Sequence, residues 1–212
     1  MTLYGPFFFF FFFTLIQNSS TNKPAVFQCR ENIFKPLDLK DTSFEPDPST
    51  YHRITSLHHR MEDGAVIVSP INNFGRVYPA RYGYHSAWWG LFSTAADWGV
   101  IMSTVMNQGL CFKTGKRIIK PETLEQLFIP QLGPEHLPIS HGRSSRPDFI
   151  RNSLRPSPFG QNRNHGLGLL LVGDKEGTKL SDGTIGLSYG TAGWIAASGV
   201  ICWVDRSIGI SM

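Results

Sequence analysis

The clearest periodic pattern of apolar residues lies between Gly90 and Gly109, in the stretch GLFSTAADWGVIMSTVMNQG. Thr94 and Asp97 have the spacing of a capping box, and Gly109 can adopt the left-handed conformation that ends a helix. The pattern predicts a helix from about Thr94 to Asn107 with Trp98 buried. Steps of three and four residues place six apolar residues on one face of this helix: Ala95, Trp98, Ile101, Met102, Val105 and Met106.

Two shorter helical patterns flank this one. The segment FQCRENIFKPLDLKDTSF predicts the end of a helix that Pro36 stops near Lys35, because proline disfavours continuation of a helix. The segment GKRIIKPETLEQLFIP predicts a short helix with Pro121 in its first turn and Pro130 after its end. The apolar residues of these two helices are Ile33, Phe34, Leu124, Leu127 and Phe128.

Strand and turn patterns occupy the remainder. The stretch MEDGAVIVSP predicts a short strand after an Asp-Gly turn, and Asp47–Ser49 predicts a turn. NHGLGLLLVGD predicts one strand, and residues 184–212 predict two strands joined by a glycine-rich crossing, with a tight turn at Asp205–Ser207. The fold class expected is α/β of the α+β kind, with two or three helices beside an incomplete antiparallel sheet.

The N-terminal segment 1–26 differs from the rest, because Phe7–Phe13 is a run of phenylalanine. The apolar run to Ile16 would reach about 15 Å as a helix, half of a bilayer core. The run fits either an artefact of the gene sequence or an unstructured leader, and a secretory or membrane-targeting segment is the alternative. Exposed, it would favour aggregation.

Composition excludes several classes of protein. The net charge of +4 comes from 20 basic and 16 acidic residues that are scattered, apart from a basic loop at 143–163, so we expect no nucleic-acid partner. Cys29, Cys111 and Cys202 are far apart and predict free thiols. His58-His59 and His85 lack the spacing of metal ligands, so we expect no metal and no cofactor.

The stretch GLFSTAADWGVIMSTVMNQG, with GKRIIKPETLEQL after it, resembles the serine β-lactamase-like family, which holds class C β-lactamases, penicillin-binding-type peptidases, esterases and fungal transesterases. The resemblance begins upstream at ENIFKPLDLKDTSF and continues to the end of the chain. It covers about the second half of a family domain. It implies a partial β-lactamase/transpeptidase-like fold, in which residues 27–212 form a C-terminal portion truncated at both ends.

By position, Thr191-Ala192-Gly193 matches the three-residue motif of the strand that borders the family's active site. The resemblance implies that the strand edge and a small Gly193 admit a substrate, and that the backbone N–H of Trp194 is an oxyanion-hole donor. Thr191 stands where β-lactamases carry lysine, which favours ester or thioester chemistry. The alternative is a glycine-rich bend in a strand that binds no ligand.

An aromatic cluster at 74–89 matches a loop that lines the rim of the substrate cleft in family members. The resemblance implies that its side chains contact an acyl group, whereas the alternative is that they pack under the following helix. The residues concerned are Tyr82, Tyr84, His85, Trp88 and Trp89.

Chemistry in this family requires an S-x-x-K motif, with serine as nucleophile and lysine one helical turn later, and a Y-x-N motif. Ser20–Lys23 has the first spacing, but Pro24 follows it and no apolar helix face surrounds it. No Y-x-N occurs in the sequence. We interpret Lys113-Thr114-Gly115 and Ser181-Asp182-Gly183 as loop and turn residues rather than active-site motifs.

The sequence therefore predicts a fragment of a β-lactamase-related serine hydrolase or acyltransferase that is inactive as written. Two alternatives remain, a non-catalytic binding module derived from that fold and a small membrane-associated protein. We expect a small acyl substrate as partner, no membrane partner and a cytoplasmic location, and the sequence leaves the oligomeric state open.

Overall fold

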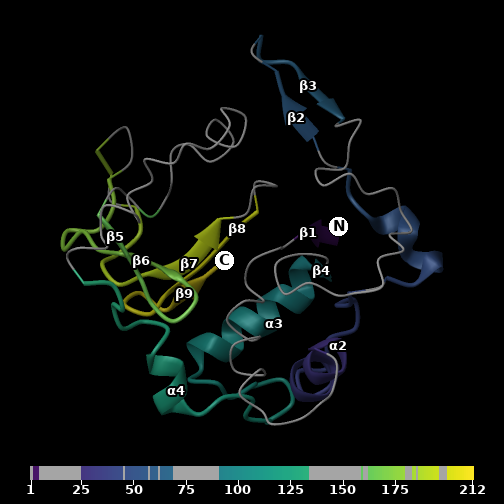
Figure 1. Cartoon of the computed structure of the whole chain (residues 1–212), viewed down its shortest axis with the longest axis horizontal. Helices are drawn as coiled ribbons and strands as arrows, with labels where there is room; N and C mark the ends of the chain where they lie inside the picture. The colour runs from purple at the N-terminus through teal and green to yellow at the C-terminus, as the bar shows by residue number, and fades with distance from the viewer. Residues whose placement is uncertain are drawn as a thin grey trace.

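The computed structural model places an antiparallel sheet of five strands on one side of the molecule, with the helices α3 (Ala95–Met106) and α4 (Pro121–Glu125) beside it (Figure 1). Beyond α3 lies the segment that holds α2 (Ala25–Cys29). This mixture of helices and antiparallel sheet confirms the expected fold class. The structure describes residues 2–4, 25–44, 46–56, 58–61, 63–68, 91–133, 159, 162–179, 183–184, 186–195 and 200–212.

The sheet is a meander in the order β5-β6-β7-β8-β9, so each strand pairs with its neighbour in sequence. Its strands are β5 (Arg163–His165), β6 (Leu170–Val172), β7 (Ala192–Ile195), β8 (Ile201–Asp205) and β9 (Ile210–Ser211). The prediction of one strand across NHGLGLLLVGD is wrong, because the chain turns at 166–169, where Gly168 has a φ of 94°. The last 29 residues likewise form three strands rather than two.

Helix α3 confirms the predicted helix to within one residue at each end. The Thr94 hydroxyl accepts the backbone N–H of Asp97 at 3.2 Å, and Gly109 has a φ of 83° just beyond the helix. The prediction that Trp98 is buried is wrong, since this side chain is only partly buried at the margin of the core. Tryptophan is large, so part of it often stays in contact with solvent. The apolar residues of α3 that are buried are Ile101, Met102 and Val105.

The carboxylate of Asp97 reaches a neighbouring segment instead of turning back to the helix start. It accepts the backbone N–H groups of Lys40 at 3.3 Å and Asp41 at 2.7 Å, and the hydroxyl of Thr42 at 2.8 Å. The hydroxyls of Thr42 and Ser93 are also in hydrogen-bond contact at 2.9 Å. The start of α3 is thereby fixed to the chain that follows the first helical segment.

That first segment combines α2 with one π-helical turn, η1 (Arg30–Phe34), and its C-cap is Lys35, as the following proline predicts. The hydroxyl of Thr114 donates to the carbonyl of Pro36 at 2.8 Å, and Lys113 forms an ion pair with Asp38. Lys113-Thr114-Gly115 therefore connects two loops, in agreement with its interpretation as a loop.

Helix α4 begins at Pro121 as predicted, and Leu124 and Leu127 are fully buried. The chain after α4 crosses close to the end of β5. A Cβ added to Gly166 would lie 1.7 Å from the carbonyl oxygen of Leu127, so only glycine permits this approach. The contact fixes α4 against the sheet.

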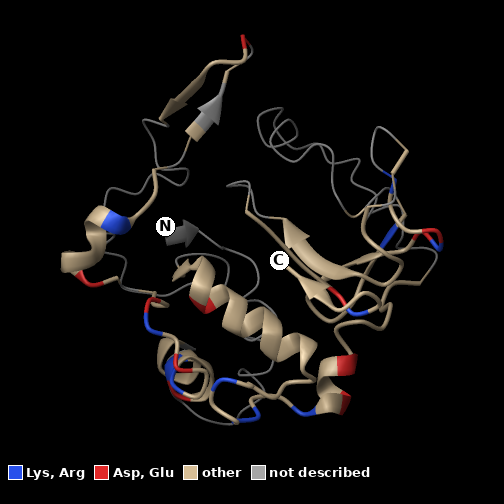
Figure 2. Ribbon diagram, turned by 180° about the vertical axis from the view of Figure 1, so that it is seen from behind, with Lys and Arg blue, Asp and Glu red and all other residues tan. Residues whose placement is uncertain are grey.

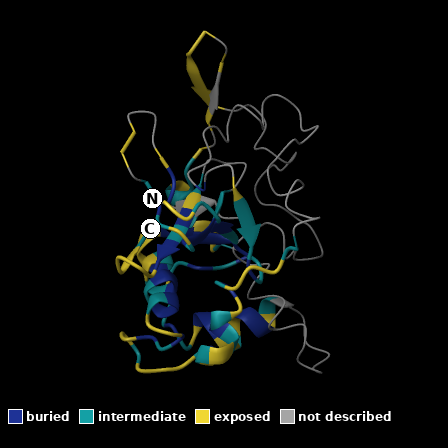
Figure 3. Cartoon of the chain, turned by 90° about the vertical axis from the view of Figure 1, so that its left-hand side faces the viewer, coloured by how far each residue is buried: buried dark blue, intermediate teal, exposed yellow. Residues whose placement is uncertain are grey.

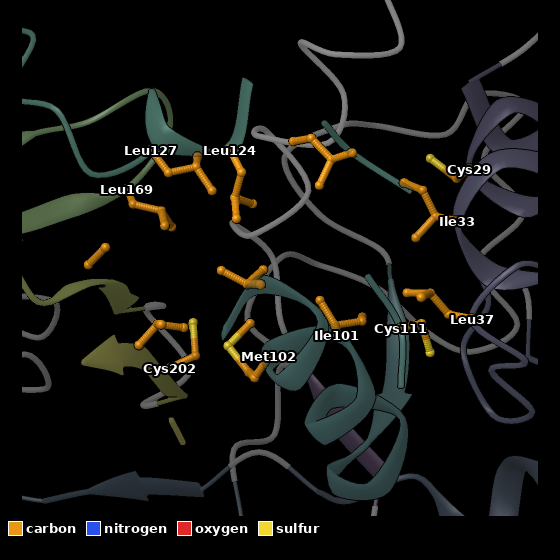
Figure 4. Packing of buried hydrophobic residues seen from close by; sticks show 14 of the residues in the cluster. Cys29, Ile33, Leu37, Ile101, Met102, Cys111, Leu124, Leu127, Leu169 and Cys202 are labelled. Atoms are coloured by element: carbon orange, nitrogen blue, oxygen red, sulfur yellow. The ribbon is translucent and has the colours of Figure 1, made fainter. Parts of the chain in front are cut away.

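The main core has α3 at its centre (Figure 4). On one side, Met102 lies toward Cys202 of the sheet, and on the other side Ile101 lies toward Cys111 and Leu37. The three cysteines are buried and free. Burial raises the pKa of the Cys29 and Cys202 thiols to about 12, which makes both unreactive near neutral pH. A smaller cluster consists of Phe159, Val172 and Leu187.

Four short strands lie outside the sheet. β1 (Thr2–Tyr4) pairs with β4 (Phe92–Thr94), and β2 (His58–Arg60) pairs with β3 (Val66–Val68). β3 is the strand predicted after the Asp-Gly turn, whereas β2, which completes a hairpin with it, was not predicted. The hairpin projects from the body of the molecule, and β3 is exposed (Figures 1 and 3). Where a simple turn was predicted, Asp47 caps the 3-10 helix η2 (Pro48–Arg53) instead.

Charged residues lie mostly in loops and at element ends around the sheet and α3 (Figure 2). Within the described ranges, no helix has the length and apolar character needed to cross a membrane. Several predictions fall outside the described residues: the phenylalanine run 7–13, Ser20–Lys23, the aromatic cluster 74–89, most of the basic loop, and Ser181-Asp182.

Candidate functional site

The predicted substrate motif falls on β7 and the residue before it. β8 pairs with all four residues of β7, whereas β6 pairs only with Ala192 and Gly193. Among the described strands, none pairs with Trp194 or Ile195 on the β6 side. The second half of β7 therefore has an open side within the part of the chain that the structure describes.

The direction of each main-chain group on β7 follows from its bonds to β6. The carbonyl of Thr191 accepts the N–H of Val172 at 3.0 Å, so Thr191 faces β6. Successive residues of a strand direct their N–H and C=O groups to opposite sides. Gly193 and Ile195 consequently face the β6 side, and Trp194 faces β8.

The bonds of β8 give the same result. Trp203 exchanges two hydrogen bonds with Met212, at 3.0 and 2.9 Å, so its main-chain groups face β9. Its neighbour Cys202 therefore faces β7, directly opposite Trp194. The N–H of Trp194 is directed into the ladder, and the N–H of Ile195 is the one directed to the open side. The role of the Trp194 N–H as an oxyanion-hole donor stays a prediction. The N–H of Ile195 is a second candidate for this donor.

Thr191, at the position of the β-lactamase lysine, is 1% exposed and lies beside Asp205. Asp205 accepts the N–H groups of Ser188 at 3.1 Å and Ser207 at 3.0 Å. Burial raises the pKa of the Asp205 carboxyl, but hydrogen bonds, chiefly those from Ser207 and Ser188, outweigh it and lower the pKa to about 2. Asp205 thus joins the β8–β9 turn to the segment before β7, where the backbone N–H of Thr191 donates to the Ser188 carbonyl at 3.1 Å.

Gly193 lies under an aromatic ring. A Cβ added there would be 2.3 Å from the carbonyl oxygen of Cys202 and 2.5 Å from Cζ of Phe159, which is completely buried. Glycine is therefore required at this position for the packing of Phe159 on the sheet. That its small size admits a substrate stays a prediction.

His165 is a neighbour of β7 that the sequence did not indicate. Its ring lies 6.1 Å from the ring of Trp194, centroid to centroid, with an interplanar angle of 57°. Burial, and secondarily the charge of Arg163, lower the pKa of His165, so the imidazole is neutral at pH 7. A neutral imidazole offers one donor and one acceptor next to the Trp194 side chain. Its sequence context carries no motif that would identify it.

A cavity of about 300 Å³ lies at the opposite end of β7, next to Gly190. This volume is at the lower limit for small-molecule pockets. Its lining includes Phe128, Pro130, Asn164, Leu171 and Tyr189. Asn164 is already bonded to both main-chain groups of Leu132, so its amide serves the fold. No cluster of three or more metal-ligand side chains occurs in the described ranges.

The antiparallel meander, the capped helix beside it and the half-paired third strand form an α+β architecture that agrees with the expected part of a β-lactamase-like fold. The Beta-lactamase family model matches residues 14–212. The chain belongs to the beta-lactamase family. A search of curated proteins gives no match.

Solved structures agree with this fold. The LovD6 mutant of simvastatin synthase from Aspergillus terreus has a TM-score of 0.68 at 19% identity, covering 90% of this chain and 44% of that one. EstCE1, a hydrolase with promiscuous acyltransferase activity, has a TM-score of 0.54 at 15% identity, covering 89% of this chain and 44% of that one. The chain therefore spans less than half the length of these structures.

Proposed function

We propose that this chain binds an acyl group at the open half of β7, as part of a β-lactamase-like esterase or transesterase that acts on esters or thioesters. The observation that carries the proposal is the half-paired strand, because its main-chain groups at Ile195 face the side that β6 leaves open. Membership of the family supports an acyl-transfer chemistry. The similarity to EstCE1 and to simvastatin synthase supports the same fold.

The chemical contribution of β7 is to bind the acyl carbonyl. An N–H group at the open side stabilises the oxygen on which negative charge develops during acyl transfer. Ile195 is the donor that the ladder direction favours, and Trp194 is the donor that the family resemblance favours. The uncharged Thr191 provides no cation for a substrate carboxylate, which favours neutral ester or thioester groups over β-lactams.

Turnover of a bound acyl group would also require a nucleophile. Acyl transfer in this family needs a serine and a lysine one helical turn apart. Ser20–Lys23 alone has this spacing in the 212 residues, Pro24 follows it, and no Y-x-N is present. Loss of the serine from an analogous hydrolase reduces turnover by about a millionfold. We therefore propose that this chain by itself binds an acyl group without turning it over.

Binding is tested with N-(4-nitrophenyl)butanamide, the unreactive amide analogue of a chromogenic ester, by isothermal titration calorimetry. We expect saturable binding that Ile195→Pro weakens about tenfold or more, because proline removes the N–H on the open side without removing a bond to β8. Ile195→Val is the matched control, since it keeps the N–H and shortens the side chain only slightly.

The outcomes separate the two donors. Saturable binding that Ile195→Pro leaves unchanged would favour Trp194 as the donor. Absence of saturable binding in the folded wild-type chain would contradict the proposal. Substitution of Gly193 is unsuitable for this purpose, because any side chain there meets the Phe159 ring.

A further inference from the structure

The hairpin β2–β3 exposes three consecutive aliphatic side chains. Val66, Ile67 and Val68 are 56%, 42% and 59% exposed, and they alternate between the two faces of the ribbon. Figure 3 shows this ribbon projecting from the body with its described residues exposed. An isolated hairpin of two strands is marginally stable in water. Among the described residues, no further strand pairs with the outer edge of β2 or of β3, so each edge can accept one.

The hydrogen bonds of the hairpin fix which groups face outward. The N–H of Met61 donates to the carbonyl of Ala65 at 2.8 Å, so these two residues face each other across the turn. Alternation along β3 then directs the main-chain groups of Ile67 toward β2. The main-chain groups of Val66 and Val68 are directed to the outer edge.

The two edges of the hairpin differ in charge. β2 reads His-His-Arg, and β3 reads Val-Ile-Val. Charged residues are a common protection of edge strands against pairing, and β3 has none. Of the two edges of this hairpin, the outer edge of β3 is formed by uncharged residues and is suited to pair with an identical strand.

We propose that two copies of this chain pair through the outer edges of β3, antiparallel and about a twofold axis at Ile67. The sequence Val-Ile-Val is palindromic, so this register places Val66 opposite Val68 of the second copy and Ile67 opposite Ile67. Val66 and Val68 then exchange both main-chain bonds with the second copy, because their groups face outward. The β-branched pairs across the new ladder stabilise it further.

The result is a four-stranded sheet at a twofold axis, in which neither β3 has a free edge. The contact involves one short strand of each copy, so we expect a weak dimer. This inference rests on the hairpin alone and is independent of the proposed acyl binding. Failure of one proposal therefore leaves the other unaffected.

The test is sedimentation velocity of the full chain at concentrations from about 10 to 500 µM, the range in which a weak dimer with a micromolar dissociation constant forms. We expect a concentration-dependent dimer in the wild type. Ile67→Lys and Ile67→Glu should each abolish it, because like charges then lie opposite each other at the axis. A one-to-one mixture of these two variants should restore a dimer, since a lysine then faces a glutamate. Ile208→Lys, at an aliphatic residue that is 58% exposed elsewhere, is the matched control and should keep the dimer.

Each outcome decides the proposal. A dimer that reappears in the mixture of the two Ile67 variants supports the proposal. A folding defect cannot explain this result, because a misfolded variant would not recover on mixing. A monomer at every concentration overturns it. A dimer that persists in both Ile67 variants, or that only Ile208→Lys removes, also overturns it and assigns the contact to another surface.

Discussion

The carboxylate of Asp97, in the first turn of α3, accepts the backbone N–H of Asp41 at 2.7 Å, across 56 positions of sequence. The same carboxylate accepts the Thr42 hydroxyl, while the N–H of Asp97 donates to Thr94. One residue thus completes the helix cap and fixes the chain that leads away from the first helical segment. Its side chain is 7% exposed, so these bonds are largely shielded from water.

Asp97→Ala should lower the free energy of unfolding by about 2–4 kcal/mol, because it leaves buried N–H and hydroxyl donors without an acceptor. Chemical denaturation monitored by circular dichroism measures the change. Asp63→Ala, which removes an exposed carboxylate that accepts only nearby main-chain N–H, should change stability by about 0.5 kcal/mol or less. Equal effects of the two substitutions would contradict the role given to Asp97.

Two glycines provide a matched pair for the packing of the sheet. Gly193→Ala should destabilise the protein by about 1–3 kcal/mol, because the added methyl group meets Phe159 and the Cys202 carbonyl. Gly99→Ala in α3 meets no atom within 4 Å and should stabilise the protein by about 0.5–1 kcal/mol. Thermal or urea unfolding measures both. A neutral Gly193→Ala would mean that Phe159 does not lie on β7 in solution.

The low pKa of Asp205 makes stability depend on pH in the acid range. Its folded pKa of about 2 lies below the unfolded value of about 3.9, so its contribution is complete above about pH 5 and is lost as pH falls toward 2. The full contribution is about 2–3 kcal/mol. Urea unfolding of the wild type and Asp205→Asn at pH 6 and pH 3 measures the loss.

The stability difference between these two proteins should shrink by about 1 kcal/mol from pH 6 to pH 3. The sign follows from the unfolded chain, which binds a proton at Asp205 before the folded chain does. A difference that is constant or that grows at low pH would show that Asp205 is not held as a carboxylate by its neighbours.

The helices were predictable from the sequence because their signals are local. Thr94 and Gly109 mark the ends of α3, and Pro121 marks the start of α4, within a few residues of the elements that they limit. Family membership was predictable for the same reason, since the resembling motifs are contiguous. The extent of Trp98 burial was not, because it depends on neighbours distant in sequence.

The details of the candidate site depend on contacts between distant strands. The side to which Ile195 directs its N–H follows from bonds made by Val172, on another strand, and by Met212, at the chain end. The ring over Gly193 comes from Phe159, which lies 34 positions earlier and outside any strand pattern. The sequence pattern shows that side chains and main-chain groups alternate along a strand. The register with the neighbouring strands decides which side each N–H group faces, and the structure provides that register.

The most direct test of the central claim is hydrolysis of p-nitrophenyl butyrate by the purified full chain, measured beside a Ser20→Ala variant and buffer alone. If the chain binds the acyl group without turning it over, the wild type, Ser20→Ala and buffer alone should give the same rate of p-nitrophenol release. Release well above the buffer rate that disappears in Ser20→Ala would contradict the account, because it would make Ser20–Lys23 a working nucleophile and base.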